Sequence, residues 1–488
     1  MTQLDTRPSP AAGERLSELS EDARSARFQQ LQLRMQAVWD SWKRDLEDES
    51  VVVIPSVSLS KAVAGSGSLS QAFEERLLFL LLLLRQPRLR MIYVTSRPID
   101  PQIIEYYLAL LPGVIPSHAL ARLALLAVDD STARPLSEKL LERPRLLARI
   151  AAQIPNPDRC HLIPYNTTSL ERDIALTLGI PMYGADPRLA ELGTKTGCRR
   201  LFAEENVPHP LGAEDLYSLD EVTEAILSML ARRPTMAEVI VKLNDGVSGA
   251  GNALVDLRGI ASLAEAERRP VVAERVRSMQ LESEETPFEA YLAKFEKDGG
   301  IVEERIVGED LLSPSVQLRV RPDRSVELLS THDQLLGGAS GQTYLGCCFP
   351  ADPAYSRLIS EPAKIIGERL AREGALGRFA VDFVVVRDTD NNWSPYAIEI
   401  NLRKGGTTHP FLTLQFLTDG GYDGDSGRFL TPDGNEKHLV ATDHLEADEL
   451  RALSVGDTPD HAMELYRRAE SLLLEEAAAA RRERTLPN

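Results

Sequence analysis

The stretch FAVDFVVVRDTDNNWSPYAIEINLRKGGTTHP, residues 379–410, decides the fold. It contains two apolar runs, each with the length and composition of a β-strand. Asp382 stands inside the first run, and Glu399 and Asn401 stand two residues apart in the second. Because residues i and i+2 of a strand point to the same face, Glu399 and Asn401 share one face. Polar groups from two adjacent strands can therefore converge.

Two carboxylates and an amide oxygen are hard ligands, which suit Mg²⁺. This ion keeps some of its waters and takes substrate phosphates as further ligands. We therefore predict a metal site of Asp382, Glu399 and Asn401. Arg403 continues the alternation and would place a planar cation beside the metal. The alternative is a row of polar side chains on a solvated strand face.

Length and composition limit the class of protein. The chain has 488 residues, enough for roughly three domains. Its hydrophobic fraction of 43% and charged fraction of 26% are those of an ordinary soluble globular protein. Its net charge of −18 argues against a nucleic-acid partner, because nucleic-acid phosphates require a basic surface.

The sequence predicts neither a membrane protein nor a secreted one. The apolar run Leu77–Leu84 is much shorter than the roughly 20 residues of a membrane span, so we expect a buried helix. The N-terminal segment MTQLDTRPSP is polar and lacks the apolar core of a signal peptide. Without a CxxC pair, the cysteines predict reduced thiols in a cytoplasmic protein; they are Cys160, Cys198, Cys347 and Cys348.

The chain opens with an apolar stripe in residues 21–47. Its members recur at spacings of three and four, which predicts one amphipathic helix. We expect this helix to pack on its own domain, and a homodimer contact is the alternative. The stripe consists of Phe28, Leu31, Met35, Val38 and Trp42.

From residue 51 short apolar strands alternate with helices. The strand candidates are Val51–Ile54, Met91–Val94, Leu123–Val128 and His161–Pro164. The alternation predicts a parallel sheet with helices on its faces. A mixed α+β region and a strand-rich block follow, and the last fifty residues read as mostly helical.

Two lysines are candidates for phosphate binding. Lys195 lies at a predicted helix start in GTKTGCRR. Lys242 ends a predicted strand in VIVKLNDGVSGAGN and precedes a loop with Gly246, Gly249 and Gly251. Glycines let backbone N–H groups close over phosphates, and a lysine adds a point charge. The lysine precedes the glycines, so this is not a P-loop, and a plain hairpin is the alternative.

Three other segments carry weaker signals. IVEERIVGED, residues 301–310, is a strand ending in acidic residues that could hold adenine and ribose, or merely expose its glutamates. His332 precedes the glycine-rich stretch GGASGQTYLG, read either as a loop over an acceptor amine or as a structural turn. His409 is a candidate acid or base, with an ordinary loop histidine as the alternative.

The order of these signals resembles the ATP-grasp superfamily. The resemblance implies ATP held between two α+β subdomains, with Gly246–Asn252 as a mobile lid over the phosphates. It implies metal ligation of Mg²⁺, or of Mn²⁺, by Asp382, Glu399 and Asn401. The residues that it assigns to ATP are Lys195, Lys242, Gly246, Ser248, Gly249, Gly251, Asn252, Glu303, Glu304, Ile306 and Glu309.

A narrower resemblance covers roughly residues 50–450. IPSVSLS, YVTSRPIDPQIIEYYLALLPG, LLERPRLL, GTKTGCRRLF, VKLNDGVSGAGN and EINLRKGGTTHP resemble the pheganomycin-type peptide ligases. Membership implies that a carboxylate substrate is phosphorylated by ATP and that an amine or peptide then displaces phosphate, with Arg403 and Lys242 as catalytic residues. An ATP-grasp kinase and a non-catalytic nucleotide-binding module are the alternatives.

The resemblance also implies a domain order of α/β and α+β type. It predicts a parallel-sheet pre-ATP-grasp domain, an ATP-grasp fold and a helical C-terminal tail. The expected boundaries are an N-terminal extension at 1–48, a pre-ATP-grasp domain at 49–190, an ATP-grasp domain at 191–420 with its lid subdomain at about 205–300, and a helical extension at 421–488.

Overall fold

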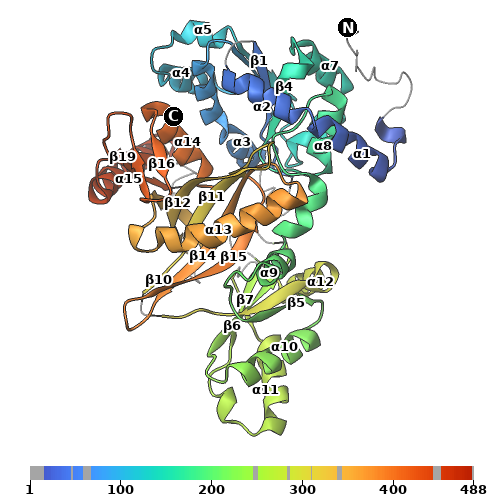
Figure 1. Cartoon of the computed structure of the whole chain (residues 1–488), viewed down its shortest axis with the longest axis vertical. Helices are drawn as coiled ribbons and strands as arrows, with labels where there is room; N and C mark the ends of the chain where they lie inside the picture. The colour runs from blue at the N-terminus through green and yellow to red at the C-terminus, as the bar shows by residue number, and fades with distance from the viewer. Residues whose placement is uncertain are drawn as a thin grey trace. The chain divides into compact units, whose positions relative to one another are not determined.

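The computed structural model describes residues 16–44, 48–58, 67–245, 251–282, 286–308, 310–337, 343–442 and 452–485. Contacts divide the chain into two compact units, Met1–Arg188 and Leu189–Asn488 (Figure 1). They are called the N-terminal unit and the C-terminal unit.

A four-stranded parallel sheet forms the centre of the N-terminal unit. Its strand order is β3-β2-β1-β4, and Val51 stands opposite both Met91 and His161. Parallel neighbours need long crossover connections, which helices provide here. This is the sheet that the alternating pattern predicted. Its strands are β1 (Glu49–Ile54), β2 (Leu89–Thr95), β3 (Leu123–Ala127) and β4 (Cys160–Pro164).

Helices make up most of the rest of this unit. The apolar run near residue 80 forms a 3₁₀ helix, Leu78–Arg85, and its apolar side chains are buried. The described part of the chain contains no helix that is long and apolar enough to cross a membrane. The α-helices are α1 (Glu21–Gln32), α2 (Met35–Arg44), α3 (Gly67–Glu75), α4 (Pro101–Ala109), α5 (Pro116–Leu120), α6 (Leu136–Leu141), α7 (Pro144–Ala152) and α8 (Ser169–Leu178).

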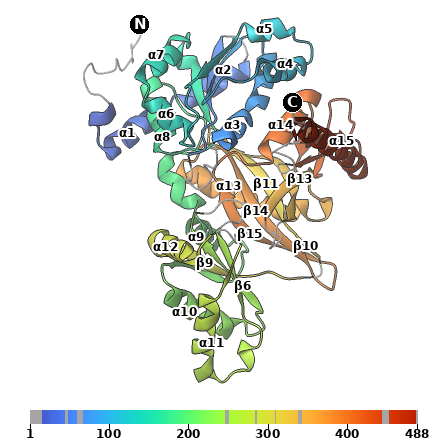
Figure 2. The same ribbon diagram turned by 180° about the vertical axis from the view of Figure 1, so that it is seen from behind.

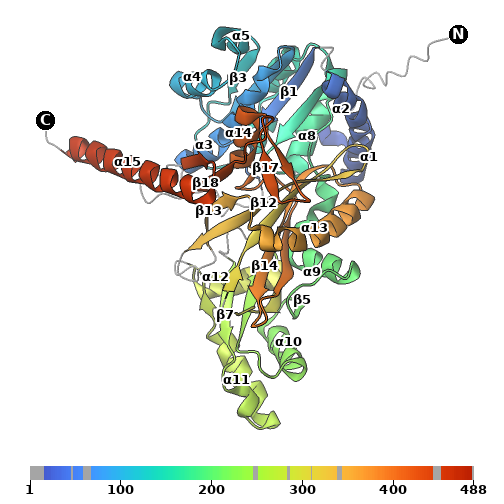
Figure 3. The ribbon, with the colours of Figure 1, turned by 60° about the vertical axis from the view of Figure 1, so that its left-hand side comes forward.

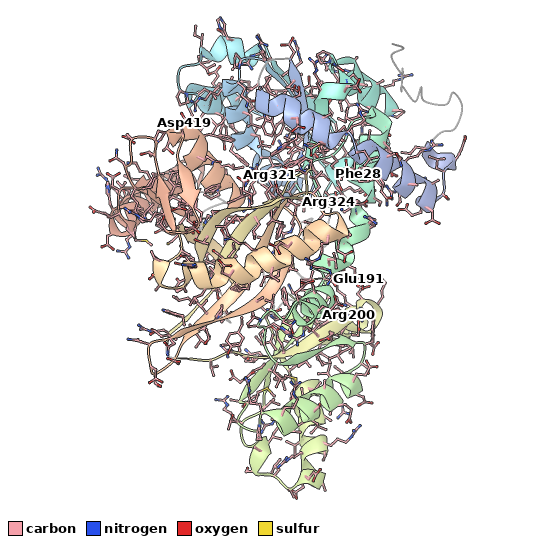
Figure 4. All side chains as sticks on the ribbon, in the orientation of Figure 1. Phe28, Glu191, Arg200, Arg321, Arg324 and Asp419 are labelled. Atoms are coloured by element: carbon pink, nitrogen blue, oxygen red, sulfur yellow. The ribbon has the colours of Figure 1, made fainter. Side chains whose placement is uncertain are left out.

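The stripe predicted for one helix over residues 21–47 is divided between α1 and α2. Between them the Arg34 guanidinium donates to the carbonyl oxygens of Gly179 and Pro157, at 2.8 and 2.7 Å. Phe28, labelled on α1 in Figure 4, is fully buried in the core of the N-terminal unit. The prediction that the stripe packs on its own domain is therefore confirmed for Phe28. The prediction of one continuous helix over residues 21–47 is wrong.

The C-terminal unit begins with a five-stranded antiparallel sheet of order β5-β9-β6-β7-β8. Its apolar face packs on helices, so that Val239 and Val241 share a core with Ile226 and Val276. The strands are β5 (Gly212–Leu216), β6 (Glu238–Leu243), β7 (Asn252–Asp256), β8 (Gln280–Leu281) and β9 (Gly300–Glu304), and the helices are α10 (Leu219–Arg232), α11 (Glu265–Arg277) and α12 (Phe288–Asp298).

The second sheet of this unit has eight strands in the order β10-β14-β11-β12-β13-β18-β19, with β15 paired to β14. Helix α13 (Pro353–Glu373) crosses one face, as Figure 1 and Figure 2 show, and Ile359 and Ile366 pack there on Val316 and Val381. The alternate residues of these strands therefore point to the opposite face. The strands are β10 (Asp310–Leu312), β11 (Pro314–Val320), β12 (Val326–Gly337), β13 (Thr343–Phe349), β14 (Gly377–Arg387), β15 (Trp393–Asn401), β18 (His438–Thr442) and β19 (Ala452–Gly456).

The segment from residue 421 onwards is only partly helical. It contains the hairpin of β16 (Gly421–Asp423) and β17 (Arg428–Leu430), and β18 then pairs with β13 of the large sheet. The predicted helical extension is therefore wrong for the described residues 421–442 and 452–456, because these strands are too short to show a periodic pattern. The final helix is present as α15 (Pro459–Thr485), which Figure 3 shows in profile.

Candidate active site

Strands β14 and β15 bring the two acidic positions together. In their antiparallel register Asp382 stands directly opposite Glu399, and Ala380 stands opposite Asn401. Opposed residues of such a pair lie on the same face, so the three predicted metal ligands share the face away from α13. The side-chain amide of Asn401 donates to Asp382 Oδ2 at 2.9 Å.

Two further strands carry polar side chains onto this face. Ser315 of β11 stands opposite Asp382, and His332 of β12 stands opposite Ser315. Gln334, also on β12, donates from Nε2 to Asp382 Oδ1 at 2.9 Å. Both oxygens of Asp382 therefore accept hydrogen bonds from amide groups. The sequence placed Gln334, with His332, only before the glycine-rich stretch and gave it no part in the metal site, although strand alternation puts the two residues on one face.

Lys195 begins helix α9 (Lys195–Glu204), and its ammonium group pairs with the Glu399 carboxylate. Asn244, just beyond β6, fixes the start of this helix. Its Oδ1 accepts from the N–H of Thr196 at 3.1 Å, and its carbonyl accepts from the N–H of Lys195 at 3.3 Å. The helix that carries Lys195 is therefore tied to the end of the strand that carries Lys242. Sequence reasoning also missed Asn244, whose only signal was its place two residues after Lys242.

The charges of this face are strongly coupled. Burial raises the pKa of Asp382 to about 6, and the nearby Glu399 carboxylate adds to the rise. Burial alone would favour the neutral forms of Glu399 and Lys195, but the attraction between their opposite charges outweighs this effect. The pKa of Glu399 is lowered and that of Lys195 is raised. Two carboxylates are thus held side by side, with a lysine as the counter-ion of one.

Arg403 lies just past the end of β15 rather than on the strand. Its N–H donates to the carbonyl oxygen of Asn401 at 2.8 Å, which turns the chain. Burial is the largest influence on the pKa values of Asp382 and Glu399, and it raises both. The Arg403 guanidinium acts against burial at each carboxylate. The structure therefore brings Arg403 close to the predicted metal ligands.

Lys242 and the glutamates of β9 meet in the smaller sheet. Lys242 is buried and pairs with Glu303, which also lies 3.5 Å from the guanidinium of Arg199. Glu304 is the next residue of the strand, so it faces the other side and pairs with Arg233. The two glutamates predicted for adenine and ribose therefore lie on opposite faces of β9.

The remaining predicted nucleotide residues are placed only in part. Asn252 opens β7 opposite Lys242, and the Gly251 carbonyl accepts from the N–H of Leu243 at 3.0 Å. Ile306 follows β9 outside regular structure. Gly246, Ser248, Gly249 and Glu309 lie outside the described residues.

The two candidate histidines occupy structured elements. His332 lies inside β12, ahead of the glycine-rich stretch; residues 338–342 of that stretch lie outside the described residues, so the predicted loop over an amine stays a prediction. It is fully buried against Phe349 and Phe411, with ring centroids 5.0 and 6.4 Å away, and burial lowers its pKa to about 3. His332 therefore stays neutral at pH 7 in this buried setting. His409 is the second residue of helix α14 (Thr408–Thr418).

The side chains of Asp382, Glu399 and Asn401 fit a divalent cation such as Mg²⁺. Their donors are carboxylate and amide oxygens, which hard cations prefer. The raised pKa of Asp382 means that its negative charge is unfavourable beside Glu399 in this buried setting. A bound cation would remove that penalty.

Comparison with known proteins gives matches of three kinds. The profile of a family described as IQCH-like, ATP-grasp matches residues 187–285 and 270–424. L-propargylglycine–L-glutamate ligase of Streptantibioticus cattleyicolor is 31% identical over 403 residues, which cover 80% of this chain and 77% of that protein. IQ motif-containing protein H of Danio rerio is 24% identical over 435 residues, covering 80% of this chain but 41% of that protein. A crystal structure of N5-carboxyaminoimidazole ribonucleotide synthetase with ADP has a TM-score of 0.49 and 12% identity, covering 88% of this chain and 98% of that one.

The chain belongs to the ATP-grasp family, as its likeness to the Streptantibioticus ligase shows. The superfamily expected from the order of the lysines, glycines and carboxylates is thereby confirmed. So is the fold class, a parallel α/β sheet followed by α+β sheets.

Proposed function

We propose that the protein is an ATP-dependent carboxylate–amine ligase, which forms an amide bond through an acyl phosphate and releases ADP and phosphate. One observation carries the proposal: Lys195, Asp382 and Glu399 converge on one sheet face, beside Asn401 and Arg403. The named relative, a ligase by its printed name, supports the same reaction class.

In the proposed site, different residues bind the different parts of ATP and the metal ion. Lys195 and Lys242 hold the phosphates of ATP, and the residues at and after the end of β9 hold adenine and ribose: Glu303, Glu304, Ile306 and Glu309. The segment Gly246–Asn252 covers the phosphates. When bound by Asp382, Glu399 and Asn401, Mg²⁺ or Mn²⁺ supplies positive charge that offsets the charge of the phosphates.

The reaction begins when an oxygen of the substrate carboxylate attacks the γ-phosphorus of ATP and ADP leaves. The amine then attacks the acyl carbon, loses a proton, and inorganic phosphate leaves. The first step brings anions together, so positioning and charge neutralisation supply most of the catalysis. Arg403 stabilises the phosphoryl group during transfer.

The substrates in this proposal are a small carboxylic acid and an amine or peptide. A cytoplasmic location accords with the four cysteines, none of which is in a disulfide; three of them are buried. The homodimer considered from the sequence stays a prediction.

Hydroxylamine tests the proposal directly, because it attacks acyl phosphates. With ATP, Mg²⁺ and a pool of amino acids and other carboxylic acids, we expect a hydroxamate and an equal amount of ADP. Arg403→Ala should lose both hydroxamate and amide, whereas Arg324→Ala, in the exposed turn after β11 that Figure 4 labels, should keep both. A kinase would instead accumulate a stable phosphate ester, and that result without any hydroxamate would refute a ligase.

A further inference from the structure

Helix α9 carries two cations one turn apart, and each reaches a different sheet of the C-terminal unit. Lys195 pairs with Glu399 of β15 in the large sheet. Arg199 is four residues further along, on the same side of the helix, and reaches Glu303 of β9 in the smaller sheet. The helix itself contacts β15, β5 and β9 (Figure 1). The proposed function uses Lys195 and leaves Arg199 without a role.

The Arg199 guanidinium is buried in a space beside β5. Its Nη1 donates to the carbonyl oxygen of Pro210 at 3.0 Å, and its Nε donates to the Glu214 carboxylate at 3.2 Å. Gly212 of β5 stands directly opposite Glu303. A Cβ at Gly212 would lie 2.8 Å from Cζ of Arg199, so a side chain there would displace the guanidinium. Packing as well as charge therefore holds Arg199 next to Glu303.

Glu303 has two cations as partners. Its side chain is only 4% exposed; Lys242 pairs with Oε1, and Arg199 Nη1 lies 3.5 Å from Oε2. Lys242 is the residue that the proposed function assigns to the phosphates of ATP. If it were the single counter-ion, its movement to a phosphate would leave a buried carboxylate uncompensated, which is strongly unfavourable. Arg199 is a second counter-ion that stays in place when Lys242 moves.

We infer that Arg199 is a positioning residue of the nucleotide site, which neutralises Glu303 and so leaves Lys242 available to the phosphates. The inference rests on the proposed function and adds to it a residue that is not itself assigned to ATP or to the metal. A planar guanidinium suits this role because it can contact two carboxylates at once, here Glu303 and Glu214. Without Arg199, Lys242 should remain on Glu303 and phosphate binding should weaken.

Magnesium tripolyphosphate is the probe for this effect. It lacks the adenine and ribose that are assigned to Glu303, so its affinity reports on phosphate binding alone. Arg199→Gln removes the charge and keeps an amide donor for Pro210. We expect calorimetry to give a Kd about tenfold higher in this variant than in the wild type. Arg199→Lys keeps the cation and should restore the Kd to within about threefold of the wild type.

Glu303→Gln separates an effect through Glu303 from a structural one. This variant has nearly the same shape and frees Lys242, so it should bind tripolyphosphate at least about threefold more tightly than the wild type. Adding Arg199→Gln to it should change the Kd less than about twofold, because no carboxylate remains at position 303 to be neutralised. Equal losses from Arg199→Gln with and without Glu303→Gln would mean that Arg199 does not act through Glu303, and would overturn the inference.

Arg200→Gln is the matched control. Arg200 is the next residue of the same helix, and it is exposed and pairs with Asp215 and Glu191 (Figure 4). The substitution removes the same charge from α9 and should leave the Kd unchanged. A loss as large as that of Arg199→Gln would reduce the effect to net charge and overturn the inference.

The double variant also decides the question if Arg199→Gln alone does not fold. Removing both partners of a buried pair is tolerated better than removing one, so Glu303→Gln with Arg199→Gln should fold. Its Kd is then compared with that of Glu303→Gln alone. A tenfold difference would overturn the inference, and a difference below about twofold would support it.

Tripolyphosphate binding needs no turnover, so the inference and the proposed reaction can fail separately. If the wild type forms neither hydroxamate nor amide, the proposed reaction fails, and the role of Arg199 still stands when the four Kd values are coupled as described. If hydroxamate forms and the Kd values show no coupling, the ligase stands and the role of Arg199 is refuted. Absence of any binding by the wild type would also refute it, because no phosphate would then compete for Lys242.

Discussion

Asp382 is held by hydrogen bonds to both of its oxygens, from Gln334 and from Asn401. Asp382→Asn preserves the shape of the side chain and removes its charge. We expect turnover to fall about 100-fold or more, since the site loses a charge that would bind the metal. The melting temperature should change little, because the loss of one of the two accepted hydrogen bonds is offset by the loss of a charge that was unfavourable in this buried setting. ADP release at limiting Mg²⁺ and calorimetry measure the two effects.

Asp390→Asn is the control for this variant. Asp390 is exposed in the turn between the same two strands, so its substitution should change neither value. Unaltered turnover of Asp382→Asn at limiting Mg²⁺ would show that the metal site is wrongly placed.

The sequence was enough to predict site residues that lie close together in the chain. Strand alternation was enough to put Glu399 and Asn401 on one face, and the register then placed Asp382 opposite Glu399. Gln334 and Asn244 could not be found in the same way. Each acts on a residue 48 positions away in the chain, and no local pattern records such a contact.

His332 and Asp333 are adjacent residues of β12, and they make the stability of the folded protein depend on pH in opposite directions. Burial lowers the pKa of His332 to about 3, so its folded state resists protonation and stability rises with pH from about 3 to 6.5. Burial raises the pKa of Asp333 to about 6, so its folded state favours protonation and stability falls with pH from about 4 to 6.

Separating these two effects gives a test of the burial of β12. Asp333→Asn removes the aspartate effect and leaves that of His332, so the urea midpoint should rise more steeply with pH between about 4 and 6 than it does in the wild type. His332→Asn should change the slope in the opposite direction. Parallel curves for the wild type and both variants would mean that neither group is buried as described.

The elements that the sequence mispredicted are those that tertiary context decides. Strand β18 was predicted as part of a helical extension, yet pairing with β13 of the large sheet makes it a strand. The apolar stripe of α1 and α2 is continuous in sequence, and only contacts with distant carbonyl groups reveal the break at Arg34.

For the whole molecule, the C-terminal strands matter because they complete the large sheet. Leu439 and Val440 of β18 are buried, and β18 covers an edge of β13 that would otherwise be exposed. A chain ending at Glu436 should therefore lose roughly 10 °C in melting temperature and aggregate through that edge. A chain ending at Glu475 keeps β18, β19 and most of α15, and should match the full chain. Light scattering and calorimetry compare them, and equal stability of both truncated chains would contradict this role.

Lys195 and Lys242 each have a carboxylate partner within the protein, Glu399 and Glu303. Unpartnered lysines would draw a polyanion from a distance, and its association rate would drop steeply as salt is added. Here the local charges cancel, and the chain as a whole carries −18. Capture of ATP should therefore be governed by exchange of ion-pair partners, with a stopped-flow association rate that varies less than about threefold between roughly 20 and 300 mM salt. A tenfold fall in the association rate over this range of salt would mean that the two lysines are not paired with carboxylates when ATP arrives.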